Sequence, residues 1–212
     1  MKNETLELLK KSHAIFTDDH FVYTSGKHGR VYVNKDALYP HTEYVSHIGK
    51  IIAEKYKDSQ IDVVVGPALG GIILSQWTAN HLSKMLKKEI LGIYTEKMPD
   101  RNQIFTRGYG KLIANKNVLI VEDIVTTGGS IEKVINSVQE GGGNVVASCA
   151  MVNKDPKHVG SKIMGIPFDF LAMVDIDVFD ADNCPMCQEN MPINITLGHG
   201  RKFLEEKEKS TI

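Results

Sequence analysis

The sequence predicts an α/β protein in which helices flank a central, mostly parallel sheet. Short continuous apolar runs alternate with segments whose apolar residues recur at helical spacing. The apolar runs lack polar–apolar alternation, which is typical of strands covered on both faces. Helices between such strands indicate βαβ units, and because no repeat or linker divides the 212 residues, a single domain is expected.

The composition narrows the class of protein. Lys plus Arg (25 residues) nearly balance Asp plus Glu (26), and no long basic run is present, so no nucleic-acid partner is expected. The longest apolar stretch, 61–74, is broken by Asp62, Pro67 and glycines, so no membrane contact is expected. The amphipathic start is unlike a secretory signal, and three cysteines without one indicate the cytoplasm.

The N-terminal half is expected to hold three helices, a hairpin and a buried strand. Asn3 can cap a first helix, and 21–34 has two short β-prone runs around SGKHG, a hairpin pattern. Thr42 can cap a second helix that ends near Tyr56, and a third follows the strand at 61–66 and ends near Lys87. The second helix is expected to bury Val45, Ile48, Ile52 and Tyr56.

The rest of the chain is expected to add four strands and a helix. A strand at 89–94 precedes a polar, basic and poorly periodic segment up to Lys116. A second strand starts at Val118, and a helix starts near Gly129 or Ser130 and ends at the glycines 141–143, since glycine readily takes the left-handed cap conformation. Apolar runs at 144–152 and near Phe168 predict the last two strands. The inner side of the helix is expected to carry Ile131, Val134, Ile135 and Val138.

The stretch VLIVEDIVTTGGS, residues 118–130, has the clearest chemical pattern. Glu122 and Asp123 follow four aliphatic residues and so fall at the C-terminal edge of a strand, where open α/β sheets bind ligands. Thr, Gly and Ser residues then lead into a helix N-terminus, where backbone N–H groups and the helix dipole favour an anion. The Walker GK[ST] ending and the GxGxxG fingerprint are both absent. A phosphate cradle beside two carboxylates suits a ligand with a phosphate next to sugar hydroxyls.

This stretch resembles the phosphoribosyl pyrophosphate (PRPP) signature of the type I phosphoribosyltransferases. VVVGPALGGI, residues 63–72, resembles the pyrophosphate-binding loop of that family, although a plain glycine-rich turn between strand and helix is an alternative for this segment alone. The resemblance implies PRPP contacts from the following residues: Leu69, Gly70, Gly71, Lys97, Arg107, Glu122, Asp123, Ile124, Val125, Thr126, Thr127, Gly128, Gly129 and Ser130.

Further segments resemble the orotate phosphoribosyltransferases within that family. FVYTSGKHGRVYVNKD resembles their N-terminal hood, IFTRGYGKLI takes the place of their mobile basic catalytic loop, and FDADNCPMCQENMPI resembles the CPxC tail of one branch. The resemblance implies a type I phosphoribosyltransferase fold, with 1–212 as one domain and a small hood from about 15–40 and about 165–200. It implies orotate contacts from Tyr32, Val33, Thr126 and Lys154.

The chain departs from the family pattern at three places. Thr24 stands where many members have a lysine before the SG of the hood, and Gly70 stands where many have a lysine in the pyrophosphate loop. No histidine lies between Thr95 and Lys116, so the KxHG element of the usual catalytic loop is missing. The cationic role is then expected to fall on Lys97, Arg101 and Arg107, with Lys27 as a further candidate.

The reaction implied by the resemblance is displacement of pyrophosphate from C1 of PRPP by a ring nitrogen of orotate. Lys97, Arg107 and Asp123 are the expected catalytic residues. Mg²⁺ is the expected cofactor, held through PRPP and waters near Glu122 and Asp123 without a direct protein ligand. The expected partners are PRPP, orotate and a second copy of the chain, because in this family the loop reaches the neighbouring subunit's site.

Two other functions compete with this interpretation. A purine phosphoribosyltransferase would bind PRPP in the same way, but the hood and Lys154 favour an anionic pyrimidine. A PRPP-sensing regulator would keep the cradle and lose catalysis. The missing loop histidine keeps this alternative open, whereas the near-neutral charge argues against an RNA-binding version.

Several residues also have purely structural interpretations. From the sequence alone, Lys97 and Arg107 could be solvated loop charges and Tyr32 could be core packing. His28 is expected to be an exposed turn residue and Cys149 a core residue. Cys184 and Cys187 form one CxxC, for which a reduced pair or an occasional disulfide is preferred. A zinc site would need two more ligands, from His199, a symmetry mate or an outside residue.

Overall fold

The chain forms two compact units in a computed structural model that describes residues 3–100, 102–174 and 176–209. Unit 1 comprises Met1–Leu8 and Tyr39–Val174, and unit 2 comprises Leu9–Leu38 and Asp175–Ile212. Unit 2 is therefore assembled from two segments that are separated in sequence by nearly all of unit 1. None of the described helices is long and apolar enough to cross a membrane.

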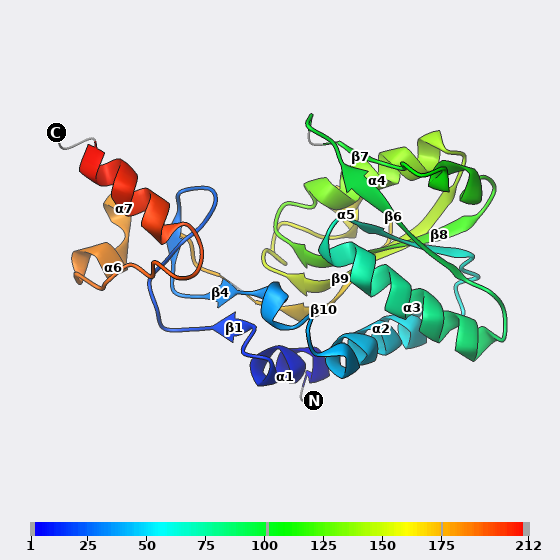
Figure 1. The fold of residues 1–212 in the computed structure, drawn as a ribbon, viewed down its shortest axis with the longest axis horizontal. Helices are drawn as coiled ribbons and strands as arrows, with labels where there is room; N and C mark the ends of the chain where they lie inside the picture. The colour runs from blue at the N-terminus through cyan, green and yellow to red at the C-terminus, as the bar shows by residue number, and fades with distance from the viewer. Residues whose placement is uncertain (1–2, 101, 175, 210–212) are drawn as a thin grey trace. The chain divides into compact units, whose positions relative to one another are not determined.

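The centre of unit 1 is a six-stranded sheet with the order β10-β9-β8-β5-β6-β7 (Figure 1). All neighbouring strands are parallel except β6 and β7, which pair antiparallel, so the predicted mostly parallel sheet is confirmed. The short strand β7 was not predicted. The strands are β5 (Val63–Pro67), β6 (Leu91–Lys97), β7 (Gln103–Ile104), β8 (Asn117–Val125), β9 (Asn144–Asn153) and β10 (Phe168–Met173).

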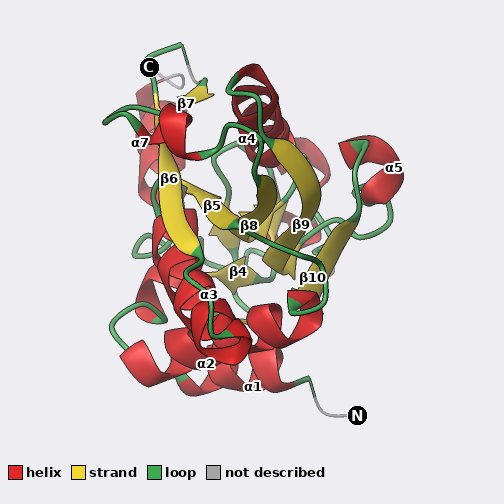
Figure 2. Cartoon of the chain, turned by 90° about the vertical axis from the view of Figure 1, so that its right-hand side faces the viewer, coloured by secondary structure: helices red, strands yellow, loops and turns green. Residues whose placement is uncertain are grey.

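Helices cover both faces of this sheet (Figures 1 and 2). Helices α2 (Thr42–Tyr56) and α3 (Gly70–Leu86) lie on one face, and α4 (Gly129–Glu140) lies on the other.

 Both predicted inner faces are confirmed. Helix α4 buries Ile131, Val134, Ile135 and Val138. Helix α2 buries Val45, Ile48, Ile52 and Tyr56. The remaining helical elements of unit 1 are α5 (Ser161–Met164), the 3₁₀ turn η2 (Tyr109–Leu112) and the first part of α1 (Glu4–Lys11).

The predicted helix caps have mixed outcomes. The side chain of Asn3 accepts a hydrogen bond from the Leu6 amide (3.1 Å), which confirms it as the cap of α1. The predicted cap at Thr42 is wrong, because Thr42 is the first helical residue and the cap position belongs to His41. Gly142 has a φ of +77° just after α4, in agreement with the predicted glycine stop.

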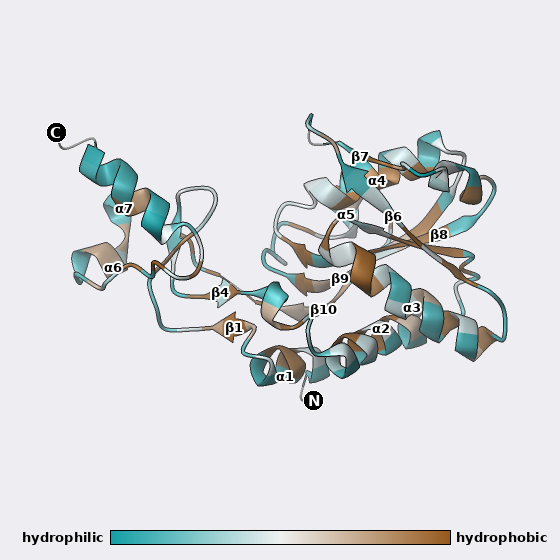
Figure 3. Ribbon diagram, viewed as in Figure 1, coloured by the Kyte–Doolittle hydropathy of each residue, from teal (hydrophilic) through white to brown (hydrophobic). Residues whose placement is uncertain are grey.

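One continuous hydrophobic core joins the sheet to α4. Val63, Val65, Val118 and Ile120 of two neighbouring strands belong to the same buried cluster as the inner face of α4. Burial of each such side chain contributes roughly 1.5–3 kcal/mol to the stability of the fold. Because the long strands and helices of unit 1 bury many of them, they stabilise this unit strongly. Figure 3 shows the hydrophobic colouring along these central strands.

Unit 2 is built from much shorter elements. Strand β2 (Phe21–Val22) pairs antiparallel with β3 (His28–Gly29), and the turn between them contains Gly26 at φ +79°, which confirms a hairpin around SGKHG. The second β-prone run divides, because β4 (Tyr32–Val33) pairs with β1 (Ile15–Phe16). The other elements are η1 (Lys35–Ala37), η3 (Ala181–Asn183), α6 (Pro185–Gln188) and α7 (Gly200–Lys209).

Candidate active site

The two adjacent acids lie near the C-terminal end of β8. The strand continues two residues past Asp123, to Val125, and both carboxylates are largely buried at 6% exposure. Glu122 Oε1 accepts the Asp123 amide (3.0 Å), and Asp123 Oδ1 accepts the Ile124 amide (2.6 Å). The local backbone therefore fixes the orientation of both carboxylates.

Tyr39 and Gly70 enclose the Asp123 carboxylate. The Tyr39 hydroxyl donates to Asp123 Oδ2 (2.7 Å). A Cβ at Gly70 would lie 1.7 Å from the same oxygen and 2.2 Å from the Tyr39 hydroxyl oxygen, so only glycine fits between α3 and the acid. Tyr39 was missed by sequence reasoning, because it lies before a helix and outside every motif.

Two helix N-termini open at the same edge of the sheet. The cap residue of α4 is Gly128 at φ +84°, and that of α3 is Leu69, which is 78% exposed; neither helix has a side-chain cap. Because β5 and β8 are parallel neighbours, the helices that follow them begin on the same side. Uncapped N–H groups and the two helix dipoles make this edge suited to binding two anionic groups.

The remaining PRPP residues predicted from the sequence lie at the end of β8, in the first turns of α3 and α4, and between β8 and α4. Gly71 is buried at the start of α3, Ile124 is half-buried and Val125 is buried at the end of β8, and Gly129 begins α4. The side chains of Thr126, Thr127 and Ser130 are exposed, and their hydroxyls can therefore reach a ligand.

The predicted catalytic cations lie on and after β6. Lys97 is the last residue of β6 and is exposed. Arg107 donates from Nε to Glu96 Oε1 (2.7 Å), and this contact raises the pKa of Arg107 and lowers that of Glu96. Such an exposed ion pair is weak, so a polyanion can compete for Arg107. Arg101 lies outside the described residues.

Lys154 follows β9 at the same edge. Its amide donates to the Val125 carbonyl (2.8 Å), which joins the ends of β8 and β9. Burial lowers the pKa of Lys154, and the negative charge of Asp123 opposes this shift. Lys154 therefore lies within the electrostatic reach of the acid.

The predicted residues of unit 2 differ in their burial and contacts. Tyr32 is half-buried against Phe21 (5.3 Å between ring centroids), and Val33 is buried. Lys27 pairs with Asp180 (3.5 Å). The prediction of an exposed His28 is wrong, because its β3 position places the side chain fully inside unit 2.

Two further predictions concern cysteine and histidine. Cys149 is fully buried in β9, as predicted for a core residue. His199 forms a hydrogen bond with Thr24 Oγ1 (3.0 Å from Nε2) and does not belong to the group of side chains around Cys184 and Cys187.

The sheet edge with two anion cradles and an acid between them is the site expected of a phosphoribosyltransferase. The profile of the family described as "Phosphoribosyl transferase domain" matches residues 34–164. The chain therefore belongs to the phosphoribosyltransferase family. Relatives named orotate phosphoribosyltransferase, 32% and 34% identical over 91% and 92% of the chain, place it among the orotate phosphoribosyltransferases. Members of the family are glycosyltransferases.

The curated relatives span nearly the whole chain. The orotate phosphoribosyltransferase of Caldanaerobacter subterraneus subsp. tengcongensis is 32% identical over 192 residues, which are 91% of this chain and 95% of that protein. The orotate phosphoribosyltransferase of Thermotoga maritima is 34% identical over 198 residues, which are 92% of this chain and 98% of that protein.

Solved structures share the fold. The orotate phosphoribosyltransferase of Mycobacterium tuberculosis H37Rv matches with a TM-score of 0.64 at 21% identity, over 81% of this chain and 97% of that one. The orotate phosphoribosyltransferase of Aeropyrum pernix matches with a TM-score of 0.59 at 26% identity, over 79% of this chain and 92% of that one.

Proposed function

We propose that the protein transfers the ribose 5-phosphate group of PRPP to orotate, giving orotidine 5′-phosphate and pyrophosphate in pyrimidine nucleotide biosynthesis. The observation that carries this proposal is the placement of Asp123 between two uncapped helix N-termini at the carboxyl edge of the sheet. The names of the relatives support orotate as the acceptor.

Each part of PRPP has a matching group at this edge. The N-terminus of α4, with the exposed hydroxyls of Thr126, Thr127 and Ser130, suits the 5′-phosphate. Glu122 and Asp123 suit the ribose hydroxyls, because carboxylates accept their hydrogen bonds. The N-terminus of α3, at Leu69, Gly70 and Gly71, suits the pyrophosphate.

The chemical step is a displacement at C1 of the ribose. A ring nitrogen of orotate forms the new bond to C1 while the bond from C1 to pyrophosphate breaks, and charge develops on the departing pyrophosphate. Lys97 and Arg107 stabilise that charge and shield the site from water, which would otherwise hydrolyse PRPP. Arg107 exchanges its contact with Glu96 for the pyrophosphate during this step.

Mg²⁺ fits the donor set of this edge. Glu122 and Asp123 offer only oxygen atoms, which Mg²⁺ prefers, and the Asp123 oxygens already accept hydrogen bonds from Tyr39 and Ile124. Binding through the ion's own waters and through PRPP is therefore the better fit. When bound, Mg²⁺ offsets negative charge on the pyrophosphate.

The roles assigned to the orotate contacts rest on the family resemblance. Lys154 offers a cation for the orotate carboxylate, and its position near Asp123 supports this role. Thr126, at the start of the phosphate loop, and Tyr32 and Val33, in unit 2, are proposed to contact the pyrimidine. The proposed hood, from about 15–40 and about 165–200, overlaps with the two segments of unit 2, Leu9–Leu38 and Asp175–Ile212.

The proposed setting is a homodimer in the cytoplasm. Three cysteines, an odd number, support a reducing compartment. The dimer is proposed because the resemblance implies a catalytic loop that serves the neighbouring subunit.

The acceptor is tested by pyrophosphate release from PRPP and Mg²⁺ with orotate, uracil, adenine, hypoxanthine and xanthine offered separately. Release with orotate alone is expected. Release with a purine alone would contradict the choice of acceptor, and PRPP binding without turnover on any base would contradict the enzyme.

The shared loop is tested by mixing two inactive variants, Lys97→Ala and Asp123→Asn. If each loop serves the partner's site, a mixed dimer contains one intact site, and statistical mixing restores about a quarter of wild-type activity. No recovery, with mixed dimers confirmed by mass spectrometry, would contradict a loop that acts across the dimer.

A further inference from the structure

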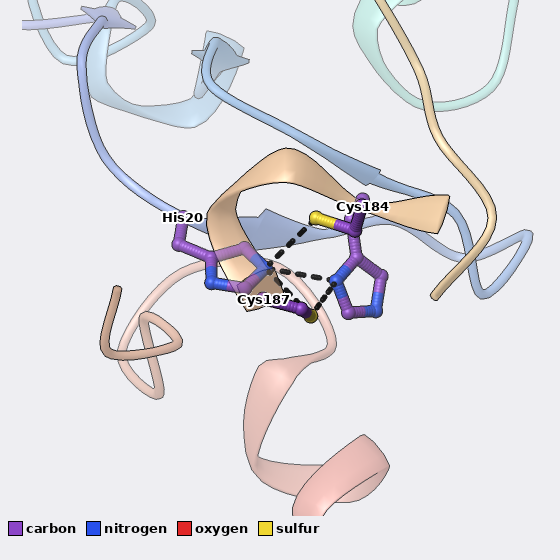
Figure 4. Close-up of side chains that lie close together, drawn as sticks. His20, Cys184 and Cys187 are labelled. Atoms are coloured by element: carbon purple, nitrogen blue, oxygen red, sulfur yellow. Dashed lines mark hydrogen bonds between the residues drawn. The ribbon is translucent and has the colours of Figure 1, made fainter. Parts of the chain in front are cut away.

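Four potential metal ligands converge inside unit 2. They are His20, His28, Cys184 and Cys187, and one donor atom from each lies within 4.8 Å of all the others. His20, His28 and Cys184 are fully buried, and Cys187 is half-buried. Figure 4 shows the side chains of His20, Cys184 and Cys187 directed toward one another.

The spacing of the donor atoms is close to that of a tetrahedral zinc site. Zinc bonds of about 2.3 Å to sulfur and about 2.0–2.1 Å to nitrogen place the donor atoms of a tetrahedron roughly 3.3–3.8 Å apart. The Cys184 and Cys187 sulfurs lie 3.7 and 3.8 Å from His20 Nε2, and Cys187 Sγ lies 3.4 Å from His28 Nδ1. The two imidazole nitrogens are 2.8 Å apart and need to separate by about half an ångström to admit the ion.

The surrounding backbone orients these ligands. His20 Nδ1 contacts the Met191 carbonyl (2.9 Å), and a proton donated there leaves the lone pair of Nε2 facing the cluster. His28 exchanges two backbone hydrogen bonds with Phe179 (2.8 and 2.9 Å), and its ring meets that of Phe203 edge-on. Cys184 caps the short helix α6, which also contains Cys187.

The donor set identifies the ion. Two sulfur and two nitrogen donors suit zinc, whereas Mg²⁺ and Ca²⁺ prefer oxygen. Two thiolates would balance the charge of Zn²⁺, so the buried site would carry no net charge. With four protein ligands the coordination is complete, which is typical of structural sites and not of catalytic ones.

The construction of unit 2 gives such an ion a structural purpose. One pair of ligands comes from Leu9–Leu38 and the other from Asp175–Ile212, and the strands of this unit are two residues long. Small units with so little regular structure commonly depend on a metal or a disulfide. We propose that His20, His28, Cys184 and Cys187 bind one structural Zn²⁺ that joins the two segments of unit 2.

The first test measures the metal in the intact wild-type protein. Protein purified under reducing conditions, supplied with zinc and then exchanged into metal-free buffer should retain about one zinc per chain by mass spectrometry. Its Co²⁺ derivative should show the visible bands of a tetrahedral site and sulfur-to-cobalt charge transfer. Retention below about 0.1 zinc per chain, or an octahedral cobalt spectrum, would overturn the proposal.

The second test uses matched variants. Cys187→Ser and His20→Asn should each lower zinc retention at least about tenfold. Cys149→Ala removes a thiol outside the cluster, and His13→Asn changes an exposed histidine whose φ of +52° asparagine tolerates, so both should keep the zinc. Full zinc retention in Cys187→Ser would overturn the proposal. If this variant fails to fold, the cobalt spectrum of the wild type decides whether the four side chains form a tetrahedral metal site.

The oxidation state of the cysteines distinguishes zinc from a covalent link. Alkylation of the protein in lysed cells, followed by peptide mass spectrometry, should find Cys184 and Cys187 without a disulfide between them. A Cys184–Cys187 disulfide in most of the molecules would overturn the proposal, because a disulfide removes both thiolate ligands.

Discussion

Unit 1 buries long apolar strands against three helices, whereas the strands of unit 2 are two residues long and enclose two histidines and two cysteines. The hydrophobic cluster that includes Val65, Ile120 and Val134 lies entirely in unit 1. Unit 1 can therefore hold a rigid polar edge on a stable sheet. Unit 2 depends on a small number of specific contacts.

This difference predicts two kinds of variant. Changes to the polar edge of unit 1 should reduce activity with little effect on folding, because the core beneath the edge is unchanged. Changes to the cysteine–histidine cluster should unfold unit 2 and leave the sheet of unit 1 folded.

The largest effect is expected for Asp123→Asn. Loss of the charge that faces the ribose should lower kcat for orotate-dependent pyrophosphate release by on the order of 100- to 1,000-fold, with a melting temperature close to that of the wild type. Asp58→Asn, an exposed acid just after α2, is the matched control and should be fully active. Activity within twofold of the wild type in Asp123→Asn, a range of about 0.4 kcal/mol, would remove Asp123 from the mechanism.

Zinc removal should destabilise unit 2 and leave the stability of unit 1 unchanged. A chelator under reducing conditions should raise the hydrogen-exchange rate of the His28 amide, which donates to Phe179, by about ten- to a hundredfold. The amides of β5 and β8 should keep their protection, because the core of unit 1 needs no metal. Equal loss of protection in both units would contradict separate stabilisation.

Gly70→Ala should weaken PRPP binding. The added methyl group collides with the Asp123 carboxylate and the Tyr39 hydroxyl, so the KM for PRPP should rise about tenfold. Gly160→Ala is the control, since a Cβ there meets no atom within 4 Å. An unchanged KM in Gly70→Ala would show that the start of α3 moves freely away from the acid.

The smallest effect is expected for Lys154→Met. Burial lowers the pKa of Lys154, so the folded chain holds this proton less tightly than the unfolded chain does. The charged amine therefore destabilises the fold at neutral pH, and the penalty fades as the pH rises through the folded-state pKa.

Lys154→Met should accordingly be slightly more stable than the wild type at neutral pH, with a difference that shrinks in alkali. The KM for orotate should rise a few-fold, by about 1 kcal/mol of lost binding. Thermal melts across pH and steady-state kinetics measure the two effects. A variant that is less stable at neutral pH would contradict the burial penalty.

The sequence predicted most of unit 1 because its signals are local. Residues 118–130 combine a buried strand, two acids and a helix start in one segment, and the structure places them as expected in β8 and α4. The contacts that sequence reasoning missed join distant residues. Tyr39 reaches Asp123 across 84 positions, and Cys184 lies near His20 across 164, so no spacing pattern could reveal them.

Short elements were the other source of error. The two-residue strand β7 and the division of the second β-prone run of the hood between β3 and β4 depend on tertiary pairing, which a few residues of local preference cannot specify. The same limitation led to the wrong expectation for His28, whose burial follows from pairing with Phe179.

A crystal structure of the protein with PRPP bound would test the proposed site most directly. The 5′-phosphate is expected at the N-terminus of α4, the ribose hydroxyls beside Asp123 and the pyrophosphate at the N-terminus of α3. PRPP bound away from this edge, or bound in the reverse orientation, would contradict it.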